Sequence, residues 1–480
     1  MSLPSDDGGG GAYQTAERIR FTSLPSYDGG GFSFVKPNES GGLQLDPSLK
    51  PRSGLRQISS TYEAQDGLGG DLEQYNSNRL DHIKGKCLVH SGSPEVYQLR
   101  LKKENTGPLT RLMLGGKQGK SPNKTILLVG ETGTGKSTLI NALVNHAMGV
   151  RWDDDVWFQV TEGSSQCHSK SADVVVYQIC GFEGKTLPYS LTIIDTPGYG
   201  DTKGIDQDDR VSQRLLDLFH SEGGVHEINA VGLVVKASDN RLSDRLRYIY
   251  DSVMSLFGKD LEENIVSLVT HSNGRTPKNV LRALEAANIQ CAKDEKNQPI
   301  HFLFDNCLDE NRTEDVEVLK NAHRITMKGM RQFGEFLNKT AAQNLEMTMN
   351  VLKERITLKA CIQNLQERIE FTKQREIHQM PKSEKCWWLG GSSLLETLKK
   401  NTGDLQRDRD QWLEESYQHV VKLEQIALNT KSLSTHIHLD FLIEKMKEKG
   451  DTEKVRRLEE MKKGEDEGTR AGLGYMFGRV

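Results

Sequence analysis

The sequence of 480 residues lacks the long apolar runs of a membrane protein. No stretch approaches the ~18 consecutive apolar residues that span a bilayer, and the N-terminal residues have no apolar core typical of a secretory signal. A surplus of positive charge is also absent, because 63 Lys and Arg stand against 67 Asp and Glu. Proteins that hold nucleic acid by charge normally carry a basic surplus. We therefore expect a cytoplasmic protein with no transmembrane segment and no nucleic-acid partner.

Cysteines are few and form no recognisable pattern. Seven occur, and no two of them make a Cys-x-x-Cys pair. An odd, scattered set is typical of a reducing compartment rather than of a disulfide framework. Cys167-His168 allows a zinc interpretation, but no second ligand pair lies at metal spacing, which favours ordinary thiols.

Glycine is plentiful, and its distribution divides the chain. Residues 1–75 hold thirteen of the 45 glycines and few apolar residues. So few cannot offset the ~1–2 kcal/mol per residue that backbone ordering costs, and we predict a disordered arm. Residues 95–103 alternate apolar and polar side chains, as a half-buried strand does. Together with the apolar residues of 109–114 they predict a small β element or linker over 76–121.

Between residues 122 and 340, short apolar runs alternate with amphipathic segments. Strands are expected over 125–129, 172–179, 191–194, 230–235, 265–269 and 301–304. Helices are expected over 137–147, 209–220, 242–257, 277–291 and 313–337. This alternation predicts an α/β fold with a doubly wound, mostly parallel sheet that helices cover on both faces.

Residues 341–480 are charged and helical in pattern as far as residue 463. Leu345, Met349, Leu352 and Ile356 recur at intervals of 4, 3 and 4, and the pattern repeats over 358–369 after a phase slip. These repeats cover under four heptads, so they indicate either a short coiled coil or an amphipathic helix packed on the core. Trp387-Trp388 indicates either a partner-binding patch or two residues buried in the helical region.

The segment Gly130-Glu-Thr-Gly-Thr-Gly-Lys-Ser137 matches G-x-x-x-x-G-K-[ST] in full. A predicted strand precedes it and a predicted helix follows, which is the context in which this motif binds phosphate. Gly130, Gly133 and Gly135 let successive backbone N–H groups turn toward phosphate oxygens. The helix N-terminus adds about half a positive charge.

Side chains of the same motif complete the expected phosphate site. Lys136 should reach the β and γ phosphates in a catalytic role, and the Ser137 hydroxyl should ligate Mg²⁺. The remaining residues expected to bind nucleotide here are Glu131, Thr132, Thr134 and Thr138.

A second element distinguishes among P-loop proteins. Asp195-Thr-Pro-Gly198 follows the predicted strand 191–194, 58 residues after Ser137. Asp195 can hold Mg²⁺ through water, and the N–H of Gly198 can approach the γ-phosphate, a contact that is lost when this phosphate leaves. The loop therefore predicts a switch, with Gly198 as a catalytic residue. The polar stretch 151–170 predicts the other switch, in which Ser164, or with less support Thr161, closes on Mg²⁺.

Base recognition is expected from the loops after the later strands. Strand 265–269 leads into Thr270-His271-Ser-Asn273, where many GTPases carry Asn-Lys-x-Asp. An Asp carboxylate accepts two hydrogen bonds from guanine, whereas Asn273 can accept at one oxygen only. Asn306, after strand 301–304, is placed to touch the base from the other side. The pattern thus predicts phosphate binding more firmly than it predicts guanine.

Together, Gly130–Ser137, Ile194–Thr202 and Val269–Asn273 resemble the paraseptin-type GTPases. They are most similar to AIG1-type (immunity-associated, GIMAP-like) G domains, with septins and chloroplast-import receptor GTPases more distant. The resemblance covers roughly 122–340. It implies a Ras-like P-loop GTPase domain, GTP or GDP with Mg²⁺ as ligands, and a homodimer formed through the nucleotide face. It also implies that a base motif beginning Thr-His suits guanine. In such dimers His271 would reach across the interface, and its alternative role is to pack on the base.

Tyr199 follows Gly198 at the place where Ras-like enzymes have a water-orienting Gln. Because a phenol cannot position the attacking water in the same way, hydrolysis should be slow, ~10⁻⁴ s⁻¹ or somewhat above. The sequence therefore predicts a GTP-binding switch that hydrolyses GTP slowly and binds an effector, or a second copy, through its C-terminal helices. One alternative is a scaffold that holds GTP or GDP without turnover. Another is a P-loop ATPase or kinase, although no arginine cluster of a kinase acceptor site is evident.

Overall fold

The computed structural model describes residues 87–106, 109–116, 121–161, 173–199, 205–239, 242–379, 391–430 and 432–463. All of them belong to the compact unit of residues 68–480. The arm predicted over 1–75 lies outside the described residues, and so do Trp387 and Trp388.

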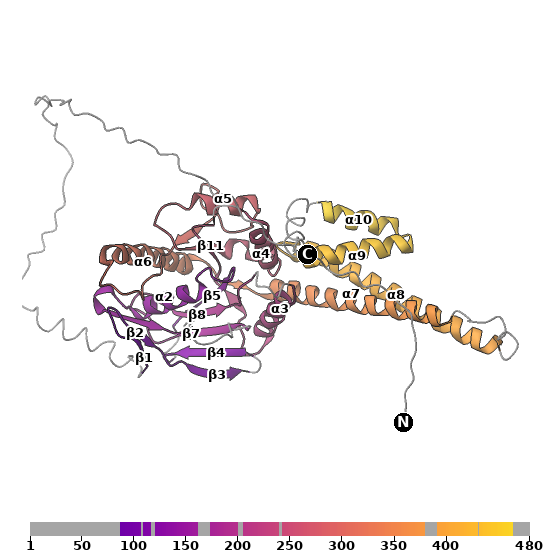
Figure 1. Ribbon diagram of the computed structural model, residues 1–480, viewed down its shortest axis with the longest axis horizontal. Coiled ribbons are helices and arrows are strands. Elements are labelled where there is room, and N and C mark those ends of the chain that lie inside the picture. Colours follow the sequence, from indigo (N-terminus) through magenta and orange to yellow (C-terminus); the bar gives the residue numbers. More distant parts are fainter. Residues whose placement is uncertain are drawn as a thin grey trace, which may run out of the picture. The chain divides into compact units, whose positions relative to one another are not determined.

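An eight-stranded sheet forms the core of the α/β part of this unit, and helices α7 (Glu346–Gln379) to α10 (Thr452–Lys463) extend away from it (Figure 1). Its strands, in spatial order, are β12 (His301–Leu303), β11 (Ile265–Thr270), β10 (Ala230–Lys236), β5 (Asn123–Val129), β8 (Ser190–Asp195), β7 (Val175–Ile179), β4 (Leu109–Leu114) and β3 (Lys102–Thr106). From β12 to β8 every neighbouring pair is parallel, whereas β7 is antiparallel to β8. The predicted doubly wound, mostly parallel α/β sheet is confirmed.

Helices cover both faces of the sheet. On one face lie α2 (Lys136–Met148) and α6 (Val316–Lys339), and on the other lie α3 (Ile205–His220), α4 (Asp244–Met254) and α5 (Lys278–Ala286). Along β5 the side chains alternate, because Ile126 and Leu128 join the first cluster and Leu127 and Val129 the second. All four are fully buried. A strand that is buried on both faces is a continuous apolar run in the sequence, which is why β5 was predictable.

The segment before the P-loop contributes to two sheets. β3 and β4 form an antiparallel hairpin, and β4 pairs with β7 at the edge of the central sheet. β1 (Leu88–His90), β2 (Glu95–Gln98) and β6 (Val156–Gln159) form a separate three-stranded sheet. The single strand predicted over 95–103 is therefore wrong, because the chain leaves one sheet after Gln98 and enters the other at Lys102. The domain boundaries expected at residues 75, 121 and 340 stay predictions.

Short elements complete the connections of the sheet. They are the 3₁₀ turns η1 (Trp152–Asp154) and η2 (Lys259–Asn264) and the two-stranded pair of β9 (Glu227–Ile228) with β13 (Gln343–Asn344). Two buried asparagines lie beside this pair. Oδ1 of Asn229 accepts from the Thr125 N–H at 2.9 Å, and Nδ2 of Asn264 donates to the carbonyl of Asn229 at 3.0 Å and to that of Ala341 at 3.1 Å. The start of β5 is thereby joined to the segment that follows α6.

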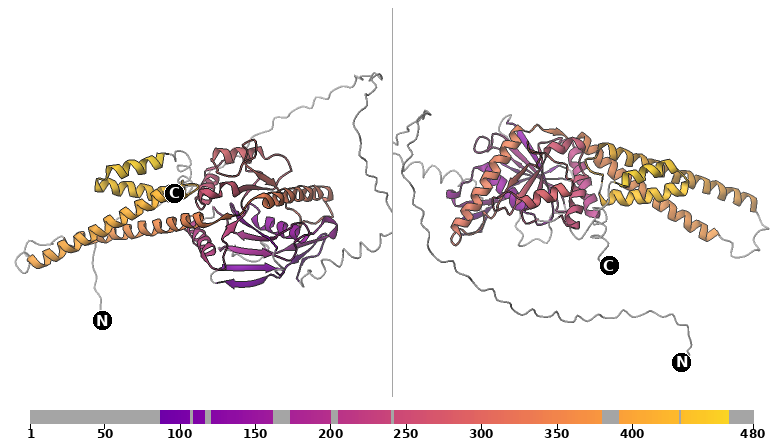
Figure 2. Two further views of the ribbon diagram at one scale, coloured as in Figure 1. Left: turned by 180° about the vertical axis from the view of Figure 1, so that it is seen from behind. Right: turned by 90° about the horizontal axis from the view of Figure 1, so that it is seen from above.

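Four helices follow the sheet: α7 (Glu346–Gln379), α8 (Gly391–Ile426), α9 (Leu433–Lys449) and α10 (Thr452–Lys463). α7 and α8 lie side by side in both directions of view (Figure 2). Leu345 and Leu352 pack in the cluster of α3 and α4, whereas Leu358 and Leu365 pack with residues of α8 and α9. The predicted helical region is confirmed, with one face of α7 on the sheet domain and its continuation against α8. A coiled coil stays a prediction. No helix in the described ranges is long and apolar enough to cross a bilayer.

Gly329 and Gly403 offer a matched pair of Gly→Ala tests inside helices. A Cβ on Gly329 of α6 would lie 2.1 Å from the carbonyl oxygen of Leu303, whereas a Cβ on Gly403 of α8 would meet no atom within 4 Å. We expect Gly329→Ala to lower the free energy of unfolding by about 2 kcal/mol through overpacking. Gly403→Ala should raise it by about 1 kcal/mol, because Ala favours the helix. Urea denaturation measures both, and equal effects would contradict the close packing of α6 on β12.

Candidate nucleotide site

The loop between β5 and α2 bends at three glycines that have positive φ angles. These are 152° at Gly130, 82° at Gly133 and 87° at Gly135, values that side-chain-bearing residues rarely adopt. A Cβ on Gly130 would lie 2.4 Å from the carbonyl oxygen of Val234, so the loop also lies directly against β10. The loop ends at the N-terminus of α2, where free backbone N–H groups and the helix dipole favour an anion.

The ammonium of Lys136 lies within this loop. Nζ donates to the carbonyl oxygens of Gly130 at 2.9 Å and Glu131 at 3.0 Å. Burial lowers the pKa of Lys136 to about 8, although the nearby carboxylates of Asp195 and Glu131 raise it. The cation is thus held where phosphate oxygens can replace the two carbonyls as its partners.

Asp195 ends β8, the strand next to β5. Its Oδ1 is buried and has no hydrogen-bond partner among the described residues. Burial raises the pKa of this carboxyl to about 6, with an opposing contribution from the charge of Lys136. A buried carboxylate oxygen without a partner costs free energy, and a divalent cation would supply the missing interaction.

The donor set fits Mg²⁺ rather than a metal enclosed by protein ligands. Ser137 is exposed in the first turn of α2, where its hydroxyl is open to a ligand. Among the residues described, no group of three or more His, Cys, Asp and Glu side chains could hold a metal. Mg²⁺ commonly takes one or two protein ligands and fills its other positions with water and phosphate oxygens. Ser137 and Asp195 are therefore the residues that could hold it.

The loop after β8 lies on the P-loop. The N–H of Thr132 donates to the carbonyl of Tyr199, and the N–H of Tyr199 donates to that of Gly130, both at 3.2 Å. A Cβ on Gly198 would lie 2.3 Å from Oγ1 of Thr132, so glycine is needed for this approach. The side chain of Tyr199 is 2% exposed and packs in the hydrophobic cluster of α3 and α4. Its phenol therefore occupies the core.

The loop after β11 adjoins the P-loop through Thr270. Oγ1 of Thr270 lies 2.6 Å from the carbonyl oxygen of Thr134. His271 has a φ of 52°, and its Cε1 is 3.6 Å from the position of a Cβ on Gly135. Asn273 is exposed, and its Oδ1 accepts from the N–H of Arg275 at 3.1 Å. The oxygen expected to accept from guanine thus closes a local turn.

Asn306 follows β12 and lies near the same loops. The N–H of Ser272 donates to the carbonyl of Phe304 at 3.0 Å, which joins the two loops. Asn306 is 9% exposed, and its Nδ2 is buried with no partner among the residues described. Burial raises the pKa of the neighbouring Asp305. The hydrogen bond from Cys307 and the nearby His271 act in the opposite direction without cancelling this rise. The structure therefore joins the loop of His271 to the loop of Asn306 through a backbone hydrogen bond.

Three further residues were expected at the nucleotide site. Ser164 lies outside the described residues. Thr161, its alternative, is buried, and its Oγ1 lies 3.3 Å from Oδ1 of Asn141 on α2. Thr138 follows Ser137 in the first turn of α2.

Two cations near the loop were not predicted from the sequence. Arg245 on α4 forms an ion pair with Glu131 at 2.8 Å. Nζ of Lys236 lies 3.9 Å from the position of a Cβ on Gly133. The sequence does indicate that Lys236 ends an apolar strand. Only the strand order, however, shows that this strand lies beside β5 and so brings Lys236 near the loop.

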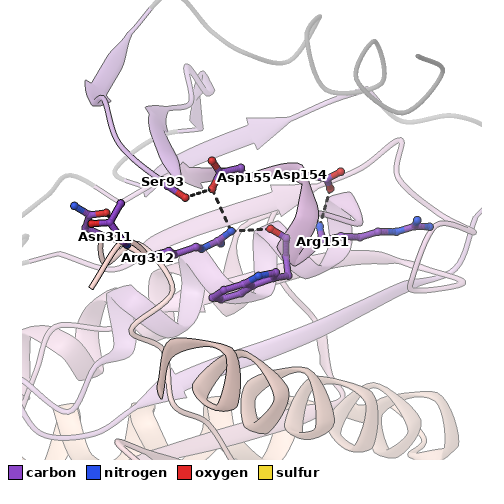
Figure 3. A network of polar contacts seen from close by, with 8 residues as sticks. Ser93, Arg151, Asp154, Asp155, Asn311 and Arg312 are labelled. Atoms are coloured by element: carbon purple, nitrogen blue, oxygen red, sulfur yellow. Dashed lines mark hydrogen bonds and ion pairs between the residues drawn. The ribbon is translucent and has the colours of Figure 1, made fainter. Parts of the chain in front are cut away.

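A second polar network lies beside the loop that carries Asn306 (Figure 3). The guanidinium of Arg312 stacks 3.9 Å from the centre of the Trp152 ring, and its Nη1 donates to the Trp152 carbonyl at 2.7 Å and to the Asp155 carboxylate at 3.4 Å. The Ser93 hydroxyl donates to the same carboxylate at 2.6 Å. Arg312 is 7% exposed. The network fastens η1 and the β1–β2 connection to the loop after β12.

Comparison with known proteins agrees with this geometry. A family model for septins matches residues 120–215, which include the P-loop and Asp195–Gly198. Human Septin-5 is 28% identical over 174 residues, covering 34% of this chain and 43% of Septin-5. Immune-associated nucleotide-binding protein 13 of Arabidopsis thaliana is 25% identical over 154 residues, which cover 32% of this chain and 39% of that protein. Over this part, the chain is similar to P-loop GTPases of the septin and AIG1 type. The predicted resemblance is confirmed.

The likeness of the chain to these proteins is partial. The chain spans well under half the length of the two curated relatives named above. A solved structure of Toc33 from Arabidopsis thaliana in complex with GDP and Mg²⁺ covers 47% of this chain and 88% of its own, with 15% identity and a TM-score of 0.33.

Retention of guanine nucleotide by this chain in Mg²⁺ should depend on pH through Asp195. Its pKa is raised to about 6, and only the ionised carboxylate supports a divalent cation. The Mg²⁺-dependent part of GDP retention should therefore increase as the pH rises from 5 to 7 and level off above. Because a bound cation lowers this pKa, the midpoint should lie at or below about 6. Release of a fluorescent GDP in Mg²⁺ and in EDTA measures it, and an unchanged profile in Asp195→Asn would refute the assignment.

Proposed function

We propose that this chain binds GTP and GDP with Mg²⁺ at Gly130–Ser137 and acts as a switch that hydrolyses GTP slowly. The observation that carries the proposal is the buried ammonium of Lys136 at the glycine loop near Asp195, whose Oδ1 is buried, with Gly198 packed on the same loop. A triphosphate requires a cation, a carboxylate for its metal and a backbone contact that senses the last phosphate. Lys136 would supply the cation, Asp195 the carboxylate and Gly198 the backbone contact. Mg²⁺, when bound, would neutralise charge on the β and γ phosphates.

The chain's own groups suggest how the switch would operate. Lys136 would exchange the carbonyls of Gly130 and Glu131 for phosphate oxygens, and the N–H groups of the loop would hold the remaining charge. A γ-phosphate between the loops would separate Gly198 from Thr132 and break the two hydrogen bonds that involve Tyr199. Loss of that phosphate would let the contact re-form. α3 follows this loop, so the change would reach α3 first.

Slow hydrolysis is supported by the position of Tyr199. Its side chain packs with α3 and α4 and is 2% exposed, so it presents no group to an attacking water. We propose that a second copy, docked on the nucleotide face, provides the missing stimulation. The alternative is a scaffold that holds GTP or GDP without turnover.

Guanine is proposed as the base on the evidence of Asn306. Its Nδ2, which has no partner among the described residues, is a hydrogen-bond donor. Such a donor complements the carbonyl oxygen of guanine but opposes the amino group of adenine. A P-loop ATPase is the less favoured alternative. The observation in its favour is that Asn273 uses its carboxamide oxygen within the chain, where it does not meet a guanine base.

Lys136→Ala should abolish nucleotide binding, because it removes the buried cation of the loop. Titration with fluorescent GDP, in competition with GTP and ATP, measures the affinity and the choice of base. Lys103→Ala, at an exposed position on β3 at the far edge of the sheet, is the matched control. Thermal unfolding should show both variants folded. Micromolar GDP binding by Lys136→Ala would contradict the phosphate site, and displacement by ATP in preference to GTP would contradict guanine.

Single-turnover hydrolysis by dilute protein should proceed at ~10⁻⁴ s⁻¹, the slow intrinsic regime, and should accelerate as protein concentration rises. Size measurement with GDP and with a non-hydrolysable GTP analogue should show a dimer with the analogue only. A rate near ~1 s⁻¹ in dilute monomer would refute the role assigned to Tyr199. Absence of phosphate release even at high concentration would favour the scaffold.

A further inference from the structure

Lys236 extends toward the P-loop from the neighbouring strand. It is the last residue of β10, which pairs in parallel with β5 so that Leu233 lies beside Val129. The end of β10 therefore reaches the level of the loop that follows β5. There, Nζ of Lys236 lies 3.9 Å from the position of a Cβ on Gly133. Because Gly133 is exposed, the ammonium lies at the open rim of the loop, whereas Lys136 lies inside it.

The charge of Lys236 has no partner within the described part of the chain. Its backbone N–H, and not its ammonium, bonds to the carboxylate of Asp239 at 3.1 Å. Lys136 and Arg245, in contrast, already have partners in the loop, namely the Gly130 and Glu131 carbonyls and the Glu131 carboxylate. A half-buried ammonium beside a phosphate-binding loop, without an anion of its own, is suited to an anionic ligand.

The strand that carries Lys236 is held firmly against the loop. Gly130 lies so close to Val234 that a Cβ would be 2.4 Å from its carbonyl oxygen. Oγ1 of Thr270 lies 3.2 Å from the carbonyl of Val235 and 2.6 Å from that of Thr134, which joins β10, β11 and the P-loop. The backbone of Lys236 is therefore already positioned. Contact between its ammonium and a bound ligand would require ordering of the side chain only.

We propose that Lys236 is a second cationic ligand for the polyphosphate of the nucleotide, acting from the rim while Lys136 acts from within. This inference rests on the proposed function and assigns it a further binding residue. A diphosphate or triphosphate carries enough negative charge to engage two ammonium groups on different sides of the chain of phosphates.

The test compares three variants of the full chain by titration with fluorescent GDP and competition with GTP. Lys236→Gln should weaken both affinities about tenfold, the loss expected for one charge-assisted hydrogen bond. Lys236→Arg keeps the charge and should restore affinity to within about threefold. Lys103→Gln, the matched exposed lysine on β3, should bind as the wild type does. The loss in Lys236→Gln should shrink at ~0.5 M salt, because screening weakens the interaction in the wild type.

The outcomes separate this inference from the function on which it rests. If the wild type binds no guanine nucleotide, the proposed function itself fails. If the wild type binds and Lys236→Gln binds equally well with the same salt dependence, only the role of Lys236 is overturned. A loss that Lys236→Arg does not restore, or that follows a lower unfolding temperature without nucleotide, would assign the effect to packing and would also overturn it.

Discussion

The structure depends on burying two opposite charges at the ends of neighbouring parallel strands. Lys136 follows β5 and Asp195 ends β8, and burial moves both pKa values toward neutrality, to about 8 and about 6. Each charged form is therefore costly in the protein alone. Among the described residues, Lys136 donates hydrogen bonds to two carbonyls, and one Asp195 oxygen has no hydrogen-bond partner. A polyphosphate with its cation would satisfy both groups at once. The same burial that costs stability thus prepares the site for ligand.

The packing around this pair connects it to the helical region. The loop that begins at Asp195 lies on the P-loop through Gly198 and Tyr199, and Tyr199 packs in the same hydrophobic cluster as α3. That cluster also includes Leu345, which directly precedes α7, and Leu352 in the second turn of α7. α7 then continues against α8. A displacement of α3 therefore meets α7 by direct contact, with no intervening element, which is the physical requirement for nucleotide to influence the helices.

The sequence is sufficient to predict an element where the pattern that identifies it lies within one short segment. β5 is apolar on both faces, and the strand before and helix after the glycine motif identify the P-loop without any knowledge of the topology. It is insufficient where a strand or side chain contacts a segment that is distant in the sequence. β6 has four residues next to an acidic turn, and its pairing with β2 cannot be inferred from either segment alone. The position of Lys236 beside Gly133 likewise depends on strand order, and the turn that Asn273 makes with Arg275 depends on local geometry.

Gly198 shows how one residue can meet two separate demands. Its pattern in the sequence predicts a bare N–H that can approach the γ-phosphate. The structure adds a second demand, because a Cβ there would lie 2.3 Å from Oγ1 of Thr132 and 2.6 Å from its Cα. The second of these atoms belongs to the backbone and cannot rotate away. Any side chain would therefore disfavour the arrangement in which the loops touch, in addition to obstructing phosphate. Glycine is required both in the arrangement observed and in the one proposed with GTP, so both arrangements remain accessible to the same loop.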